Sequence, residues 1–112
     1  GYSDVICESQ ELVELLLKGL LRILFIDSPK WHDVDIVLKE HQGKLPEKVQ
    51  QHLGRICEFS KELRKEREIS FYGEDDFLPT ESYSKEDAQN CLDEVIWLYQ
   101  LLFEYFGGVL EK

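Results

Sequence analysis

The sequence predicts a single all-α domain, an up-and-down antiparallel helical bundle that includes the whole of residues 1–112. Long segments repeat apolar residues every three or four positions, and no segment shows the alternation of a half-buried strand. Glycine and proline lie between these segments, where the chain is expected to turn. A length of 112 residues suits one domain, and a hydrophobic content of 43% is sufficient for a packed core.

Four helices are expected, three of them long and one short. The first occupies the leucine-rich run before Asp27, in which Gly19 is the only helix breaker. Asp33 is placed to cap the short helix, which is expected over residues 34–42 and is followed by a glycine. These two helices account for the N-terminal part of the chain.

The remaining two long helices are separated by an acidic, turn-rich loop at residues 73–83. Pro46 is expected to begin the first of them, whose apolar stripe consists of Val49, Leu53, Ile56 and Leu63. Ser84 and Asp87 have the spacing of an N-cap and its reciprocal acid. The last helix should therefore start after Ser84 and end near Phe106, before two glycines.

Two of these helices have more apolar surface than a small bundle can bury. In the first, the consistently polar positions are only Gln10, Glu14, Lys18 and Arg22. The last carries a wide apolar face made of Ala88, Leu92, Val95, Ile96, Trp97, Tyr99, Leu101, Leu102, Phe103 and Phe106. A helix packed on one side needs a stripe of only about 100°. We therefore expect a homodimer, since two-fold dimers are the commonest assemblies; an uncovered apolar patch is the alternative.

Charge and cysteine content limit the partners and the compartment. With 23 acidic and 13 basic residues the net charge is −10, which excludes a large basic surface but leaves room for a small basic patch. The three cysteines lack metal-ligand spacing and are typical of a reducing cytoplasm, so no metal or other cofactor is expected. Charged residues within the leucine-rich run argue against a membrane span. The chain begins at Gly1 and contains no methionine, so we expect it to lie inside a longer protein.

Arg67 is the sharpest candidate for a functional residue. It follows Leu63 by four positions, so a continuing helix places it in register with the buried stripe. A guanidinium there must be paired or must face a cleft, because burial of an unpaired charge is strongly unfavourable. A ligand contact and a structural ion pair with Glu14 both agree with this spacing.

Two further features are candidates for binding or catalysis. The only dense basic cluster of the chain could hold a phosphate or form a solvated face of alternating charge, and it consists of Lys61, Arg64 and Lys65. His32 could act as a base beside Asp33. A local hydrogen bond from His32, with Asp33 as the helix cap, explains this pair equally well.

Taken in order, several segments resemble the HEPN domain family. They are QELVELLLKGLL (10–21), IDSPKWHDV (26–34), LRKEREISFYG (63–73), the P-x-x-x-Y element that ends at Tyr83, and SKEDAQNCLDEV (84–95). The resemblance extends from about Gly1 to Phe106 and implies a helical bundle that dimerises. Members of this family usually have one further helix before the helix that opens this chain, and that helix is missing here.

The resemblance also implies a function. Many family members are metal-independent ribonucleases, some of them toxins, and others are silenced by a nucleotidyltransferase partner protein. The nucleases carry an arginine that steadies the phosphate and, four to six residues later, a histidine that moves the proton of the ribose hydroxyl. Arg67 matches the arginine, but the position five residues on is Tyr72. A tyrosine titrates near ~10 and is a poor general base at neutral pH.

We therefore predict a dimeric HEPN-like module that binds a nucleotide, an RNA or a nucleotidyltransferase in a toxin–antitoxin setting, without strong catalysis. The expected ligand-binding residues are Arg64, Arg67, Tyr72, Lys18, Glu14 and His32, and any catalysis would depend on Arg67 and Tyr72. One alternative is a degenerate metal-independent ribonuclease in which Tyr72 or His32 replaces the missing base. The other is a purely structural helical dimer. DNA and membranes are not expected partners.

Overall fold

The computed structural model describes residues 1–28, 33–72 and 83–110, with the side chains of residues 66–72 and 108–110 excepted. Within these residues the chain is helical and contains no strand, which confirms the predicted all-α class. The elements are α1 (Tyr2–Ile23), α2 (Val34–Glu40), the 3₁₀ turn η1 (Gln42–Lys44), α3 (Glu47–Gln51), α4 (Leu53–Tyr72) and α5 (Lys85–Leu110). His32 and residues 73–82 of the predicted loop lie outside the described part of the chain.

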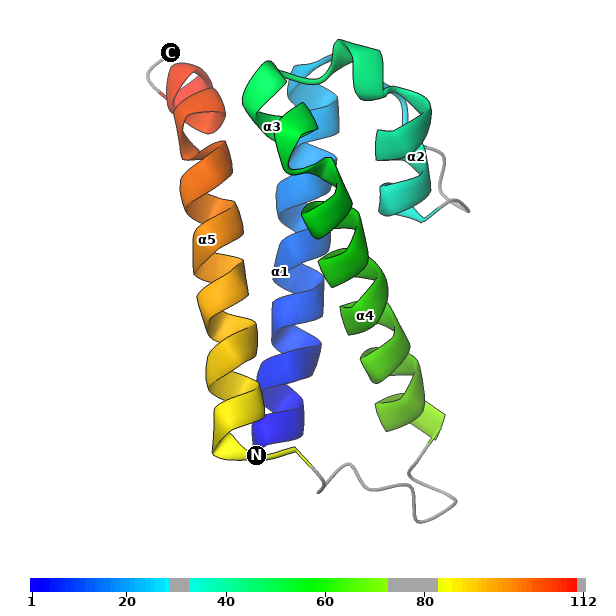
Figure 1. The fold of residues 1–112 in the computed structure, drawn as a ribbon, viewed down its shortest axis with the longest axis vertical. Helices are drawn as coiled ribbons and strands as arrows, with labels where there is room; N and C mark the ends of the chain where they lie inside the picture. The colour runs from blue at the N-terminus through cyan, green and yellow to red at the C-terminus, as the bar shows by residue number, and fades with distance from the viewer. Residues whose placement is uncertain (29–32, 73–82, 111–112) are drawn as a thin grey trace.

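Three long helices form the body of the domain (Figure 1). α1 lies between α4 and α5 and packs against both. α4 runs antiparallel to α1, and α5 then runs parallel to α1, so successive long helices alternate in direction as predicted. α2, η1 and α3 lie near the end of the bundle where α1 finishes, and α2 packs against α4.

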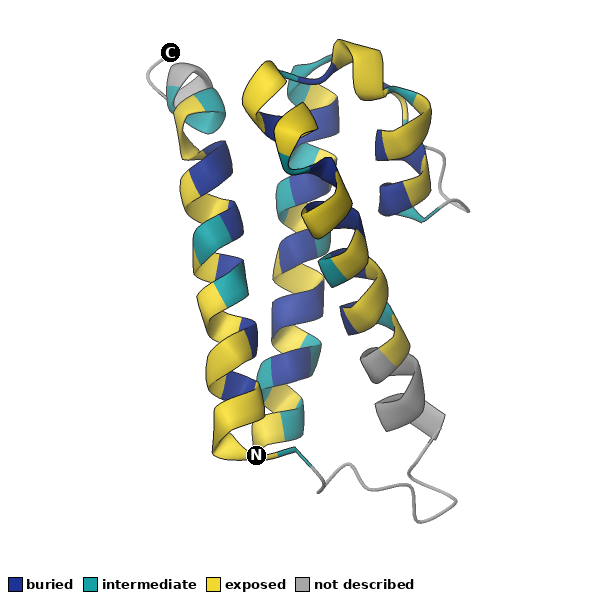
Figure 2. Cartoon of the chain, in the orientation of Figure 1, coloured by how far each residue is buried: buried dark blue, intermediate teal, exposed yellow. Residues whose placement is uncertain are grey.

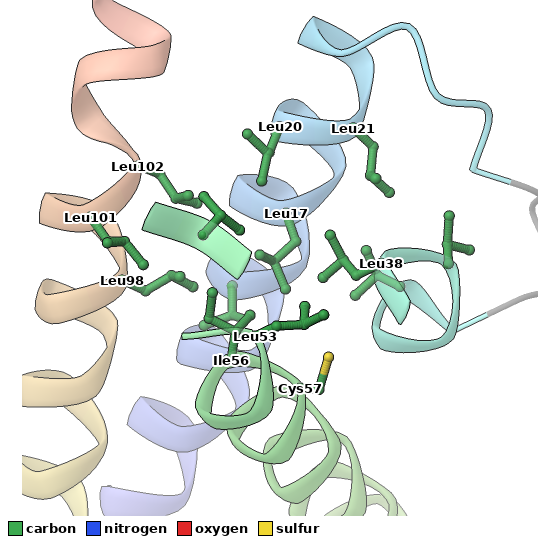
Figure 3. Packing of buried hydrophobic residues seen from close by; sticks show 14 of the residues in the cluster. Leu17, Leu20, Leu21, Leu38, Leu53, Ile56, Cys57, Leu98, Leu101 and Leu102 are labelled. Carbon is green, nitrogen blue, oxygen red and sulfur yellow. The ribbon is translucent and has the colours of Figure 1, made fainter. Parts of the chain in front are cut away.

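The hydrophobic core lies where the long helices and α2 face one another (Figure 3). The predicted stripe is buried along its whole length, from Val49 in α3 to Leu53, Ile56 and Leu63 in α4. α1 and α5 meet this stripe with a set of fully buried leucines, namely Leu17, Leu20, Leu21, Leu98 and Leu102. Each buried leucine contributes about 1.5–3 kcal/mol relative to an exposed one, so these helices are held mainly by their apolar faces.

Of the two predicted helix N-caps, the one at α5 is confirmed and the one at α2 is not. The N–H of Asp87 donates to Oγ of Ser84 (3.0 Å), and the N–H of Ser84 donates to a carboxylate oxygen of Asp87 (2.9 Å). This reciprocal pair confirms the cap predicted for α5. Asp33 occupies the N-cap position of α2, but its side chain does not cap the helix. The carboxylate instead lies 3.6 Å from Nε of Arg64.

Three helix boundaries differ from the prediction. α2 ends at Glu40 and passes into η1. The helix expected to run on from Pro46 is divided at His52, whose N–H donates to the Val49 carbonyl three residues back (3.1 Å), as in a tighter 3₁₀ turn. α5 continues through both glycines to Leu110. A glycine costs a helix only about 1 kcal/mol, and this part of α5 is supported by Phe106, which packs against Gly19 of α1.

α1 ends in a left-handed turn at Phe25. The N–H of Ile26 donates to the Leu21 carbonyl (2.9 Å) and the N–H of Phe25 donates to the Arg22 carbonyl (3.1 Å), which is the Schellman pattern of helix termination. Glycine usually occupies the left-handed position, but here it is Phe25, with a φ of 59° and a side chain that is 94% exposed. The turn brings Ile26 back into the core, so burial of Ile26 sustains an unfavourable backbone conformation.

The predicted excess of apolar surface is present on α1 and α5. On α5 the exposed apolar residues are Leu92, Ile96, Tyr99 and Phe103. On α1, Leu12 and Leu15 are exposed although the helix contacts three others. Figure 2 shows exposed positions interleaved with buried ones along the middle of α5. None of the described helices is apolar enough over a sufficient length to cross a membrane.

Candidate functional site

The basic cluster on α4 is divided between the interior and the surface. Arg64 turns toward α2, and its Nη1 lies 2.8 Å from Oδ1 of Asp35. The Arg64 side chain is 22% exposed and that of Asp35 only 7%. A charge-assisted hydrogen bond of this length compensates the burial of the carboxylate. Arg64 therefore ties α2 to α4, and a ligand at this guanidinium would have to compete with Asp35.

Asp35 is a structural residue that the sequence reasoning missed. Its neighbours Val34, Val37 and Leu38 are all buried, so the carboxylate stands among core positions of a short helix. A lone acid within such an apolar set is a usable sequence signal, because a buried carboxylate requires a partner. The structure therefore shows a buried ion pair between an arginine and a carboxylate at Arg64 and Asp35. A pair between Arg67 and Glu14 was one of two alternatives for Arg67, and it stays a prediction.

The two lysines of the cluster lie on the outer face of α4. Lys61 and Lys65 are exposed and, with Lys39 of α2, line a shallow depression of about 400 Å³ that also includes Glu58 and Glu62. Three ammonium groups beside two carboxylates give this surface a small positive excess on a chain whose net charge is −10. This is the small basic patch that the composition allowed, and its charge suits one phosphate group better than a long polyanion.

Arg67 lies in α4 one turn beyond Leu63, and its side chain is not among those described. The preceding positions of the same stripe, Ile56, Ser60 and Leu63, are all buried. The helical register from which Arg67 was predicted is therefore confirmed as far as Leu63, the preceding position of the stripe. The group that Arg67 contacts remains a prediction.

Tyr72 ends α4 five positions after Arg67. A regular α-helix turns about 100° per residue, so the two positions are about 140° apart around the helix axis. By the same rotation, position 72 lies on the side of α4 that carries Lys61 and Lys65, whereas position 67 continues the buried stripe. α4 alone therefore does not place the two candidate catalytic positions on one face.

The remaining predicted ligand residues have less specific surroundings. Lys18 and Glu14 form an ion pair across one turn of α1, with Nζ 3.7 Å from Oε2, and both side chains are partly exposed. Such surface pairs contribute only about 0.3–0.5 kcal/mol. The predicted contact between Glu14 and Arg67 concerns a side chain outside those described, and His32 lies outside the described residues altogether.

A second groove, of about 550 Å³, lies between α4 and α5. Its walls include Ile6 and Leu63, and its polar lining includes three carboxylates, those of Glu62, Asp87 and Glu94. Glu94 also binds Arg55 of α4, whose guanidinium carbon lies 3.7 Å from the centre of the Trp97 ring. This groove is acidic, so we do not assign it to a phosphate-bearing ligand.

Two of the three cysteines, Cys57 and Cys91, are buried. Burial raises the pKa of the Cys57 thiol and of the Cys91 thiol, so both remain protonated at neutral pH, and the thiolate is the reactive form. All three cysteines are free.

The fold places the protein in a class, that of small up-and-down helical bundles. In α4, the helix antiparallel to α1, Arg67 follows the buried stripe. The HEPN domain family matches residues 1–104, which is nearly the whole chain, and the protein belongs to this family. Membership confirms the resemblance that the sequence motifs indicated. No curated protein and no solved structure matches the chain.

Proposed function

We propose that this HEPN domain is a dimeric binding module that holds a phosphate-bearing ligand, a nucleotide or a segment of RNA, without turning it over. Arg67 is the main contact. The observation that carries this proposal is the register of α4, in which Arg67 follows Leu63 on a stripe of buried residues. A guanidinium at such a position requires an anionic partner.

We propose that the partner of Arg67 is an external anion. Asp35 is the only buried carboxylate among the residues whose burial is described, and Arg64 already binds it. An arginine can bind a phosphate through two parallel hydrogen bonds. The lysine-lined depression on the neighbouring face of α4 supplies additional positive charge at the same helix.

Strong catalysis is not part of this proposal. General acid–base assistance contributes about 10²- to 10⁴-fold to a rate, and it requires a group that can accept a proton at neutral pH. Tyr72 stands in place of the histidine of the nuclease pattern, and its position is on another face of α4 from that of Arg67. The degenerate ribonuclease therefore remains the second candidate, favoured only by family membership.

A nucleotidyltransferase in a toxin–antitoxin setting is the partner protein that the family implies, and we propose that it would contact the same end of α4. The cytoplasm is the proposed compartment, because three free cysteines are stable in a reducing environment. An adjacent nucleotidyltransferase gene would support this setting.

The proposal is tested by adding labelled single-stranded RNA and, separately, ATP to the protein in the presence of EDTA. We expect saturable binding that weakens as salt rises, because phosphate contacts release counterions, while the RNA stays intact on a denaturing gel. Metal-independent cleavage that disappears in Arg67→Ala would instead support the ribonuclease. Absence of binding to both probes would contradict the proposed function.

A further inference from the structure

The groove of about 550 Å³ between α4 and α5, called the acidic groove below, is lined in part by apolar side chains. α1 lies between the two helices (Figure 1) and contributes Ile6, and α4 contributes Leu63; both residues belong to the core. Phe59 and Tyr83 are only partly buried, so two aromatic residues at the groove retain exposed surface. An occupant that covers this surface gains hydrophobic stabilisation.

The charged side chains of the acidic groove all have the same sign. They are Glu62 of α4 and Asp87 and Glu94 of α5, and no described lysine or arginine side chain lines the groove. Glu94 is already bound by Arg55, whose Nε lies 3.1 Å from Oε2. Glu62 and Asp87 are both exposed, so their charge is available to an occupant. The groove is therefore complementary to a cation that also carries an apolar group.

The arrangement of these carboxylates favours an organic cation on a protein over other cations. Within the described residues, no three acidic, histidine or cysteine side chains lie close enough together to hold a metal ion. Small-molecule sites bury most of their ligand, whereas the exposure of Glu62 and Asp87 leaves an occupant partly in solvent. A side chain presented by another protein surface meets both conditions.

Arginine is the side chain that fits this lining best. Its methylene groups pack along apolar surface while its charged end stays in water. Its planar guanidinium binds a carboxylate through two parallel hydrogen bonds and stacks on aromatic rings. The same pairing occurs within the chain beside the acidic groove, where Arg55 binds Glu94 and stacks 3.7 Å from the centre of the Trp97 ring.

We infer that the acidic groove is a docking site for a segment of a partner protein that presents an arginine next to an apolar residue. The guanidinium binds Asp87 or Glu62, the arginine stem packs on Phe59, and the apolar neighbour packs on Leu63. This site is separate from the phosphate site of the proposed function. Glu62 stands between the acidic groove and the lysine-lined depression, so α4 has surfaces of opposite charge on its two sides.

The test titrates the ¹⁵N-labelled chain with the peptide acetyl-Arg-Leu-Leu-Arg-amide and follows the amide NMR signals. We expect saturable shifts concentrated at Leu63, Asn90 and Cys91, with a Kd of about 1 mM for so short a peptide. The control peptide carries citrulline, which has the shape of arginine without its charge, and should bind at least about tenfold more weakly. Equal binding of the two peptides would overturn the inference.

The net charge of −10 attracts any cationic peptide, so the place of binding must be tested as well. Asn90→Lys adds an ammonium group to the lining of the groove, whereas Gln89→Lys adds the same charge at the preceding exposed position, outside the lining. We expect Asn90→Lys to raise the Kd for the arginine peptide at least about tenfold and Gln89→Lys to raise it less than about twofold. Equal effects, or shifts spread over acidic positions elsewhere, would overturn the inference.

A second pair of variants removes a charge instead of adding one. Glu62→Gln neutralises a carboxylate of the acidic groove, and Glu58→Gln neutralises an exposed carboxylate one turn earlier on α4, which lines only the lysine-lined depression. We expect Glu62→Gln to raise the Kd about threefold and Glu58→Gln to leave it unchanged. A Glu58→Gln variant that binds as weakly as Glu62→Gln would contradict the assignment of the site.

Two further outcomes have distinct meanings. Groove signals that move when the protein alone is diluted would assign the acidic groove to a second copy of this chain and would overturn the inference. The peptide and RNA assays are independent of each other. RNA binding without peptide binding would overturn this inference alone, and peptide binding without RNA binding would contradict the proposed function alone.

Discussion

Arg64 and Arg67 stand three positions apart on α4, and the structure distinguishes their surroundings. Arg64 has a nearly buried carboxylate within hydrogen-bond distance and lies at the contact between α2 and α4. Arg67 continues the stripe of Ile56 and Leu63. The same residue type thus serves as an internal ion-pair partner at one position and is proposed as a ligand contact at the other.

Replacing Arg64 tests the first of these roles. We expect Arg64→Ala to lower the free energy of unfolding by about 2 kcal/mol, because it leaves the buried Asp35 carboxylate without its recorded partner. Lys65→Ala is the matched control, since Lys65 is the next residue and is exposed. Urea unfolding followed by circular dichroism measures both. Equal stability of the two variants would show that the Arg64–Asp35 pair does not hold α2 on α4.

The cysteines provide a second test at single residues. Burial raises the pKa of the thiols of Cys57 and Cys91, whereas Cys7 is only partly buried. We expect brief alkylation of the native protein at pH 8 to modify Cys7 first and the other two at least about tenfold more slowly. Peptide mass spectrometry gives the order. Early modification of Cys91 would mean that α5 separates readily from α1.

Helix ends are where the sequence and the structure differ most. The reciprocal pair of Ser84 and Asp87 could be predicted because it depends on residues three positions apart. The division at His52 and the continuation of α5 through Gly107 could not, because they depend on packing between helices distant in sequence. Local propensity is a weak preference that tertiary contacts override.

The left-handed residue at the end of α1 leads to a prediction for this element. Phe25→Gly removes the steric cost of a positive φ, and the lost side chain is almost fully exposed. We expect the free energy of unfolding to rise by about 1 kcal/mol, measured by urea titration. Phe25→Ala keeps a Cβ and should give no such gain. A destabilised glycine variant would indicate that the Phe25 ring makes a contact that stabilises the fold.

At the scale of the whole molecule, the class and topology of the fold could be predicted from the sequence, and the site only partly. The stripe from Val49 to Leu63 follows directly from helical periodicity and is buried as expected. The partner of Arg64 could not be predicted, because Asp35 is 29 residues away and only the folded bundle brings the two together. A polar contact between residues far apart in the chain produces no periodic sequence pattern from which it could be predicted.

The proposed dimer also has a consequence for the whole molecule. A subunit stabilised by its partner unfolds at a temperature that depends on protein concentration, because association favours the folded state by mass action. We therefore expect Tm to rise by several degrees between low and high micromolar protein, measured by differential scanning calorimetry. Ile96→Glu should remove most of this dependence. A constant Tm in the wild type would indicate a folded monomer.

The central claim is that Arg67 binds a negatively charged ligand. The most direct test measures the RNA affinity and the thermal stability of the Arg67→Ala variant. A hydrogen-bonded charge contact contributes about 1.5–3 kcal/mol, so we expect the Kd for labelled single-stranded RNA to rise at least about tenfold while Tm stays close to that of the wild type. Lys44→Ala, at an exposed lysine of η1, serves as the control of equal charge. Unchanged affinity, or a large fall in Tm without loss of binding, would contradict the claim and would assign Arg67 to a purely structural pair.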